Sequence, residues 1–113
     1  TCALPISGDL LLVSAGPGHL STVEALIDVA KHAGARTFCI TATPDGQAPM
    51  ACDQMLVIRA QTMANDLGGT SVLPMGSLFE GAQFLTFELL ILVLRDHLGV
   101  TPDAMRARHT NLE

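Results

Sequence analysis

Basic residues are scarce in this sequence. Lysine and arginine together number 6, against 11 aspartates and glutamates, and the formal net charge is −5. Non-specific binding to nucleic acid or to an anionic membrane surface requires a basic patch. The sequence therefore predicts neither a nucleic-acid partner nor a membrane partner.

Long apolar runs and leader signals are also missing. The longest apolar stretch, residues 84–94, is interrupted by Thr86 and Glu88, and it is too short to span a bilayer. No charged segment precedes an apolar one at the start, so we expect no signal peptide. The three cysteines fit neither a disulfide framework nor a Cys-x-x-Cys metal site. We therefore expect a reduced, cytoplasmic protein without a metal ion.

Hydrophobic side chains are what the sequence has in quantity. They make up 49% of the 113 residues, whereas charged residues make up 15%. These proportions indicate a folded chain, and the length allows at most one domain. So short a chain has too little interior for so many apolar residues. We expect it to oligomerise, to be part of a larger domain, or both.

Short apolar runs alternate with helical patterns in the first half of the chain. The expected strands are residues 9–14, 36–41 and 55–58. A helix capped by Ser21 or Thr22 and ended by Gly34 lies between the first two, and a short helix over residues 48–53 precedes the third. This alternation predicts an α/β fold, a three-layer sandwich with a parallel sheet flanked by helices.

The second half is expected to be helical after a surface loop. Residues 61–69 are polar and end in two glycines, which indicates the loop. The longest helix spans residues 77–98 and has almost no polar side, so it should be buried in a core or in a subunit interface. Gly99 ends it, and Thr101 caps a last helical turn over residues 103–107.

The turn Gly16-Pro17-Gly18 after the first strand is a candidate anion cradle. Backbone N–H groups at a helix N-terminus favour a phosphate. A dinucleotide-binding fingerprint is an alternative, but position 21 is Ser rather than Gly and the second strand lacks a ribose-binding acid after it. A plain turn is a third reading, because isolated Gly-x-Gly matches are weak.

Glu80 has two readings that are compatible with each other. Ser77 and Glu80 have the spacing of a capping box, with Ser77 at the N-cap. A carboxylate between Phe79 and Phe84 could also be partly desolvated and act as a general base. His109 lies in a tail rich in arginine, which is either solvent-exposed or closes over an anionic substrate.

Three segments of the sequence carry a resemblance to a known family: GDLLLVSAGPGHLSTV, VLPMGSLFEGAQFLTFELLILVL and MRARHTNLE. They resemble the SIS-domain sugar isomerases, and most closely the 6-phospho-3-hexuloisomerase branch, over residues 8–113. The resemblance implies a five-stranded parallel sheet between helices, of which this chain is the C-terminal part within a single SIS domain. Residues 1–6 match the translation of a common sequencing adapter, so we expect residues 1–7 to be a non-native leader.

The resemblance also implies an activity and a set of site residues. The activity is aldose–ketose isomerisation of a phosphorylated sugar without a cofactor, in a homodimer or homotetramer with sites between subunits. Glu80 matches the family's proposed base, and His109 matches the histidine of its terminal motif and would be the acid. The candidate phosphate-binding residues are Ser14, Gly16, Gly18, Ser21 and Thr22.

One departure from the family lies in the glycine loop. The family commonly has Ser-Gly-Ser-Gly-Glu-Thr where this chain has Ala-Gly-Pro-Gly-His-Leu, so only the glycines match. The nearby hydroxyls of Ser14, Ser21 and Thr22 are the available substitutes. The altered loop favours an alternative function, a non-catalytic regulatory module that binds a sugar phosphate.

Overall fold

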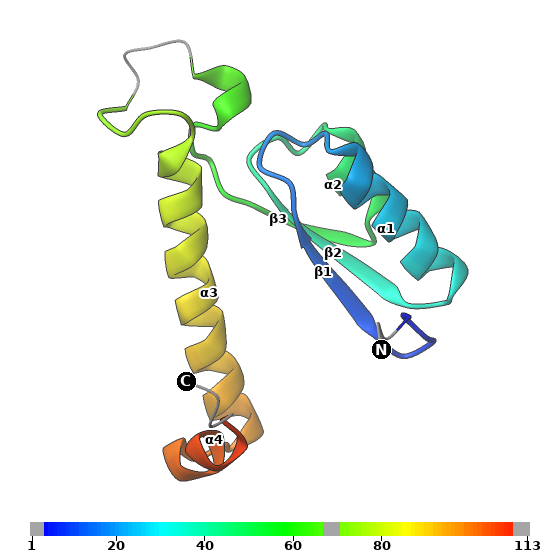
Figure 1. The fold of residues 1–113 in the computed structure, drawn as a ribbon, viewed down its shortest axis with the longest axis vertical. Coiled ribbons are helices and arrows are strands. Elements are labelled where there is room, and N and C mark those ends of the chain that lie inside the picture. Colours follow the sequence, from blue (N-terminus) through cyan, green and yellow to red (C-terminus); the bar gives the residue numbers. More distant parts are fainter. Residues whose placement is uncertain (1–3, 67–70, 110–113) are drawn as a thin grey trace. The chain divides into compact units, whose positions relative to one another are not determined.

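The structure is a computed structural model that describes residues 4–66 and 71–109 (Figure 1). Parts of three expected features lie outside the described residues: the leader, the loop over residues 61–69 and the terminal motif. The chain forms two compact units, Thr1–Gln83 and Phe84–Glu113.

The first unit is built on a three-stranded parallel sheet. Its strands, in spatial order, are β1 (Leu10–Ser14), β2 (Arg36–Thr41) and β3 (Gln54–Val57). Leu12 lies opposite Phe38 in the first pair, and Ile40 lies opposite Leu56 in the second. Helices α1 (Ser21–His32) and α2 (Gln47–Ala51) connect the strands, and a 3₁₀ turn, η1 (Met63–Asn65), follows β3. The predicted α/β class with a parallel sheet flanked by helices is confirmed.

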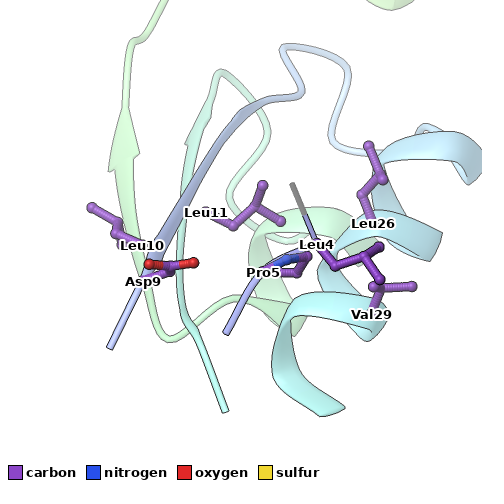
Figure 2. A pocket seen from close by; sticks show the side chains of 7 residues that line it. All are labelled: Leu4, Pro5, Asp9, Leu10, Leu11, Leu26 and Val29. Atoms are coloured by element: carbon purple, nitrogen blue, oxygen red, sulfur yellow. The ribbon is translucent and has the colours of Figure 1, made fainter. Parts of the chain in front are cut away.

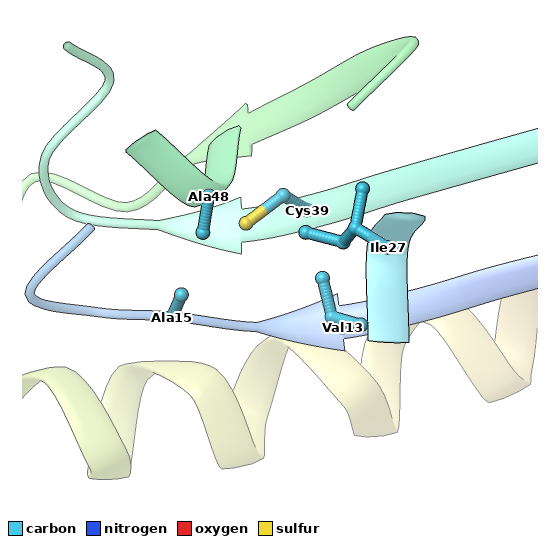
Figure 3. Close-up of a cluster of buried hydrophobic side chains, with 5 residues drawn as sticks. All are labelled: Val13, Ala15, Ile27, Cys39 and Ala48. Carbon is cyan, nitrogen blue, oxygen red and sulfur yellow. The ribbon is translucent and has the colours of Figure 1, made fainter. Parts of the chain in front are cut away.

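The core of this unit lies between the sheet and the helices α1 and α2. Alternate residues of a strand point to one face, which places Val13 and Cys39 on the same side of the sheet. They meet Ile27 of α1 and Ala48 of α2 in a buried cluster (Figure 3). Burying a side chain such as Ile27 stabilises a fold by about 1.5–3 kcal/mol. This cluster therefore fixes both helices on the sheet.

A polar link holds the start of β3 against β2. The carboxylate Oδ2 of Asp53 accepts hydrogen bonds from the Thr37 N–H at 2.7 Å and from the Thr37 hydroxyl at 3.0 Å. These two bonds lower the pKa of the Asp53 carboxyl below its usual value. The bond from the Thr37 N–H has the larger effect, and the bond from the Thr37 hydroxyl comes next. The Asp53 N–H donates to the Thr37 hydroxyl in turn. The link fixes where β3 begins.

Several expected boundaries shift in the structure. Helix α1 begins at Ser21 with Leu20 at its N-cap and no side-chain cap hydrogen bond, so the expectation that Ser21 or Thr22 is the cap is wrong. Gly34 follows the helix with φ of +77°, as predicted for its end. The strand expected over residues 55–58 is Gln54–Val57, and the helix expected over residues 48–53 is Gln47–Ala51.

The predicted surface loop after β3 is wrong in its first part. Gln61 and Thr62 are buried, with 7% and 3% of their surfaces exposed. Both the N–H and the hydroxyl of Thr62 donate to the side-chain oxygen of Asn65, and the Gln61 carbonyl accepts the N–H of Phe79. Thr62 can be buried because it is hydrogen-bonded in this way, whereas Oε1 of Gln61 is buried without a hydrogen-bond partner among the described residues.

The second unit contains most of α3 (Ser77–Leu98) and all of α4 (Pro102–Arg108). Gly99, with φ of +63°, follows α3 as predicted. The hydroxyl of Thr101 accepts the N–H of Ala104, and Pro102 is the first residue of α4, so the predicted cap is confirmed. Helix α4 extends one residue further at each end than the predicted turn over residues 103–107.

Helix α3 is longer than its apolar centre. By length and composition alone it could cross a membrane, since it has 22 residues and a window of mean hydropathy 1.6. The apolar stretch over residues 84–94 is thus only part of a longer hydrophobic helix. Core helices of soluble proteins can have the same length and composition, so these two properties do not identify a membrane span. The absence of a membrane partner stays a prediction.

Candidate functional site

The carboxyl end of β1 borders a cavity of about 280 Å³. The residues that line it all belong to the first unit: Ser14, Gly16, Pro17, Leu20, Thr62, Met63, Met75, Gly76, Phe79, Glu80 and Gln83. Ligands of parallel α/β folds bind beyond the carboxyl ends of the strands. The volume is near the lower end of ligand pockets, which span roughly 300–1,000 Å³. We therefore take this cavity as the candidate site.

A larger hollow of about 470 Å³ lies near the amino end of β1. Figure 2 shows Leu11, Leu26 and Val29 gathered around the segment that carries Leu4. Asp9 is the one ionisable residue among the described residues of its lining, and its carboxylate accepts the N–H of Ile6. This hollow offers apolar surface rather than groups for chemistry.

Gly16 lets α3 approach the loop after β1. A Cβ at this position would lie 2.7 Å from a ring carbon of Phe79, which is closer than real atoms come. The carbonyl of Gly16 accepts the Ala42 N–H and the Thr43 hydroxyl, both at 3.1 Å. The loop is thereby held from the β2 side while the Phe79 ring packs on it. This packing brings the next residue, Glu80, to the cavity.

The other candidate phosphate residues lie outside the lining of the cavity. Gly18 has φ of +80° and packs on the loop after β2, where a Cβ would lie 2.9 Å from the Thr43 carbonyl oxygen. Its own carbonyl accepts the N–H of Ala48. Ser21 and Thr22 are exposed at the start of α1. The structure thus brings Ser14 and Gly16 together with Glu80, but not Gly18, Ser21 or Thr22.

Glu80 lines the cavity without the predicted capping box. Helix α3 begins at Ser77, and the Glu80 N–H donates to the Gly76 carbonyl at 3.3 Å. The cap position therefore falls on Gly76, which has no side chain, so the expectation of Ser77 as the N-cap is wrong. Gly76 has φ of +81°, and a Cβ on it would lie 2.5 Å from the Met63 nitrogen.

The environment of Glu80 also differs from the expectation. Glu80 is exposed, and so is Phe84, so the carboxylate is not desolvated between two buried rings. Glu80 is the one ionisable side chain among the described residues that line the cavity. A ligand that fills the cavity would displace water from this carboxylate.

Sequence reasoning missed two polar residues of the cavity, Thr62 and Gln83. The Ser14 hydroxyl donates a hydrogen bond to Oε1 of Gln83. Gln83 follows Glu80 by three residues, and side chains at that spacing are neighbours on a helix. That spacing is the signal that could have identified Gln83. Thr62 lies outside any helix or strand pattern in the sequence, so no comparable spacing pointed to it.

His109 belongs to the second unit. It follows α4 as its C-cap residue, it is exposed, and its N–H donates to the Arg106 carbonyl at 3.1 Å. Its assignment as the acid of the reaction stays a prediction. The remainder of the terminal motif, residues 110–113, lies outside the described residues.

The cysteine thiols of the first unit are poorly suited to nucleophilic chemistry. Burial raises the pKa of Cys39 to about 11, and burial also raises the pKa of Cys52. The thiolate is the nucleophile, so both thiols should react more slowly near neutral pH than an ordinary cysteine does. Cys2 lies outside the described residues.

Residues 4–66 and 71–109 contain no cluster of His, Cys, Asp and Glu that could hold a metal ion.

Comparison with known proteins identifies three curated relatives with the same name, 3-hexulose-6-phosphate isomerase. The protein of Mycobacterium gastri is 36% identical over 107 residues, which are 95% of this chain and 54% of that protein. The protein of Methylomonas aminofaciens is 36% identical over 108 residues, covering 95% and 59%. The protein of Bacillus subtilis strain 168 is 29% identical over 109 residues, covering 94% and 58%.

A solved structure shares the fold. It is a crystal structure of a hypothetical protein, with a TM-score of 0.82 and 20% sequence identity, and the match covers 99% of this chain and 61% of that one. No protein-family model matches the chain. The chain spans about half the length of the curated relatives it matches. Over almost all of its own length, it is therefore similar to 3-hexulose-6-phosphate isomerases.

Proposed function

We propose that this chain forms part of a sugar-phosphate isomerase that acts on 3-hexulose 6-phosphate. The observation that carries the proposal is the cavity at the carboxyl end of β1, which Glu80, Ser14 and Gly16 all line. These are three of the residues that the family resemblance singles out. The similarity to relatives with the name 3-hexulose-6-phosphate isomerase supports the same substrate class.

The proposed reaction is an internal proton transfer. A 3-hexulose has its carbonyl at C3, so a base that removes the C2 proton produces an enediolate. Return of that proton to C3, with transfer of the hydroxyl proton from O2 to O3, leaves the carbonyl at C2. The transfer is thus between C2 and C3, rather than between C1 and C2 as in an aldose–ketose pair. The electrons stay within the substrate, and no external oxidant or reductant is required.

Glu80 is the proposed base. It is the ionisable side chain of the cavity, and a bound sugar would displace water from its carboxylate. The apolar side chains of Pro17, Leu20 and Phe79 line the same cavity and would help to exclude solvent. A positioned base typically contributes about 10²–10⁴-fold to the rate. His109 is the proposed acid, as the resemblance implies.

The start of α1 is the proposed phosphate anchor. Leu20 lines the cavity and is the N-cap residue of α1, so the helix N-terminus borders the cavity. The first turn presents N–H groups and the hydroxyls of Ser21 and Thr22 to an anion. Glu24 in the same turn is paired with His19 at 2.7 Å, which offsets its charge when that histidine is protonated. A phosphate bound here would let the sugar carbons extend toward Glu80.

We also infer that the chain is the C-terminal part of a single SIS domain. The chain's span of about half of its relatives supports the inference that it is only a part of such a protein. The proposed protein acts in the cytoplasm as a homodimer or homotetramer, and the apolar surface of α3 supports such an assembly. A leader over residues 1–7 would lie outside this domain.

The experiment compares Glu80→Gln with Glu88→Gln, a matched change further along the same helix and outside the cavity lining. Turnover of 3-hexulose 6-phosphate and calorimetric affinity are measured on the protein as its gene encodes it. We expect Glu80→Gln to lower kcat by about 10²–10⁴-fold while affinity is retained, and Glu88→Gln to behave as wild type. A wild-type protein that binds the sugar phosphate without turnover would instead support the regulatory module.

A further inference from the structure

Gln83 is a polar residue of the cavity to which the sequence assigned no role. It lies one turn after Glu80 in α3, and both side chains line the cavity. Gln83 is half-buried, as is Ser14 at the end of β1. The two side chains are 69 residues apart in sequence and are joined by a hydrogen bond.

Ser14 fixes the orientation of the Gln83 amide. The serine hydroxyl donates to Oε1, so the planar amide turns its Nε2 away from Ser14. Among the hydrogen bonds of the described residues, the Gln83 side chain takes part only through Oε1. Both N–H groups of Nε2 are therefore available to an acceptor in the cavity, beside the carboxylate of Glu80.

The proposed reaction creates negative charge where such donors act. When Glu80 removes the C2 proton, the C3 carbonyl oxygen becomes an enediolate oxygen. Donors held in place before the reaction stabilise such an oxygen more than mobile water does. The described residues of the cavity lining include no Lys, Arg or His, so a neutral donor is the group available there.

We propose that Gln83 donates from Nε2 to the substrate oxygen on C3, and that Ser14 is the positioning residue that orients the amide. This assignment rests on the proposed function and adds Gln83 to its proposed base and acid. It also gives Ser14 a different role from the phosphate binding that the resemblance implies. A purely structural role, in which the pair only ties α3 to β1, would affect stability and leave turnover unchanged.

Three variants separate the role of the Gln83 amide from that of the Ser14 hydroxyl. Gln83→Glu keeps an oxygen that accepts the hydrogen bond from Ser14 and removes the N–H donors. Gln83→Met keeps the length of the side chain but removes the oxygen acceptor as well as the N–H donors. Ser14→Ala leaves the donors but frees the amide to rotate. Gln54→Met, at an exposed position of β3 outside the cavity lining, is the control. Each protein is assayed for kcat and KM on 3-hexulose 6-phosphate and for its melting temperature.

The expected result is a loss of kcat with KM nearly unchanged. Removing one donor to a developing oxyanion lowers kcat by about 10²–10³-fold, and we expect that loss in both Gln83 variants. Ser14→Ala should lose less. Adding Ser14→Ala to Gln83→Met should cause no further loss, because Ser14 acts through the amide. Gln54→Met should match the wild type.

The outcomes distinguish this inference from the proposed function. Wild-type kcat in Gln83→Glu or Gln83→Met, together with an inactive Glu80→Gln, would overturn the role of Gln83 and leave the proposed function standing. A wild-type protein without turnover would overturn both. If Gln83→Met does not fold, Gln83→Glu gives the same readout, since it retains the hydrogen bond from Ser14.

Discussion

At the scale of single residues, the loop after β1 depends on two glycines in contact. A Cβ on Gly46 would lie 2.4 Å from the Gly18 carbonyl oxygen, and a Cβ on Gly18 would lie 2.9 Å from that of Thr43. Gly18 also has φ of +80°, which most residues avoid. The close packing of these backbones fixes the loop that borders the cavity.

Gly18→Ala should therefore destabilise the fold. The left-handed backbone costs an alanine about 1–2 kcal/mol, and the contact with Thr43 adds to it. Gly81→Ala is the matched control, since a Cβ there meets open space on helix α3, and it should stabilise by up to about 1 kcal/mol. Denaturant unfolding measures both. Equal free energies of unfolding for the two variants would refute the packing described for Gly18.

Cys39 should resist alkylation in the native protein at neutral pH. Burial raises the pKa of the folded thiol to about 11, above the ordinary value of 9.0 for a cysteine. An unfolded chain therefore loses this proton at lower pH than the folded one, so this residue's contribution to stability falls as the pH rises from 9 to about 11. Iodoacetamide labelling, read by peptide mass, should modify Cys39 only in denaturant. Labelling of Cys39 at the unfolded-state rate would contradict this.

At the scale of elements, apolar patterning was sufficient for the strands and helices but not for their ends. The strand β2 is mostly buried, so its apolar pattern was enough to locate it, and its bounds match the expected residues 36–41. The loop before α1 is held instead by a tertiary contact, the hydrogen bond from the Ala48 N–H of α2 to the Gly18 carbonyl. The burial of Thr62 likewise depends on its tertiary surroundings. A local pattern contains no information on such contacts.

Helix α3 has many exposed apolar side chains, which we expect to be covered by another subunit. Leu85, Leu89 and Val93 are four residues apart and form a stripe, with Leu89 63% exposed. We expect Leu89→Lys to lower the molar mass in solution by half or more, because burying a lysine in an interface is unfavourable. Glu88→Lys places the same side chain at a position that is already charged, and it should keep the wild-type mass. Light scattering that finds a wild-type monomer at micromolar concentration would refute the assembly.

At the scale of the whole molecule, three residues that the sequence singled out lie around one cavity, and their roles stay predictions. Glu80, Ser14 and Gly16 were all singled out from motifs, and they share one cavity. Gln83 was missed because its role depends on a contact with Ser14, 69 residues away. The packing of Phe79 on Gly16, which creates this neighbourhood, could not be read from either segment alone.

The central claim is that the Glu80 carboxylate moves a proton between two carbons of the substrate. Its most direct test is the incorporation of deuterium from D₂O into 3-hexulose 6-phosphate and its product, followed by NMR at C2 and C3. While the substrate is an enediolate, the proton held by the carboxylate can exchange with solvent. The wild type and Glu88→Gln should therefore incorporate deuterium. Glu80→Gln should bind the sugar phosphate and incorporate at least about 10²-fold more slowly. Incorporation by Glu80→Gln at the wild-type rate would contradict the account.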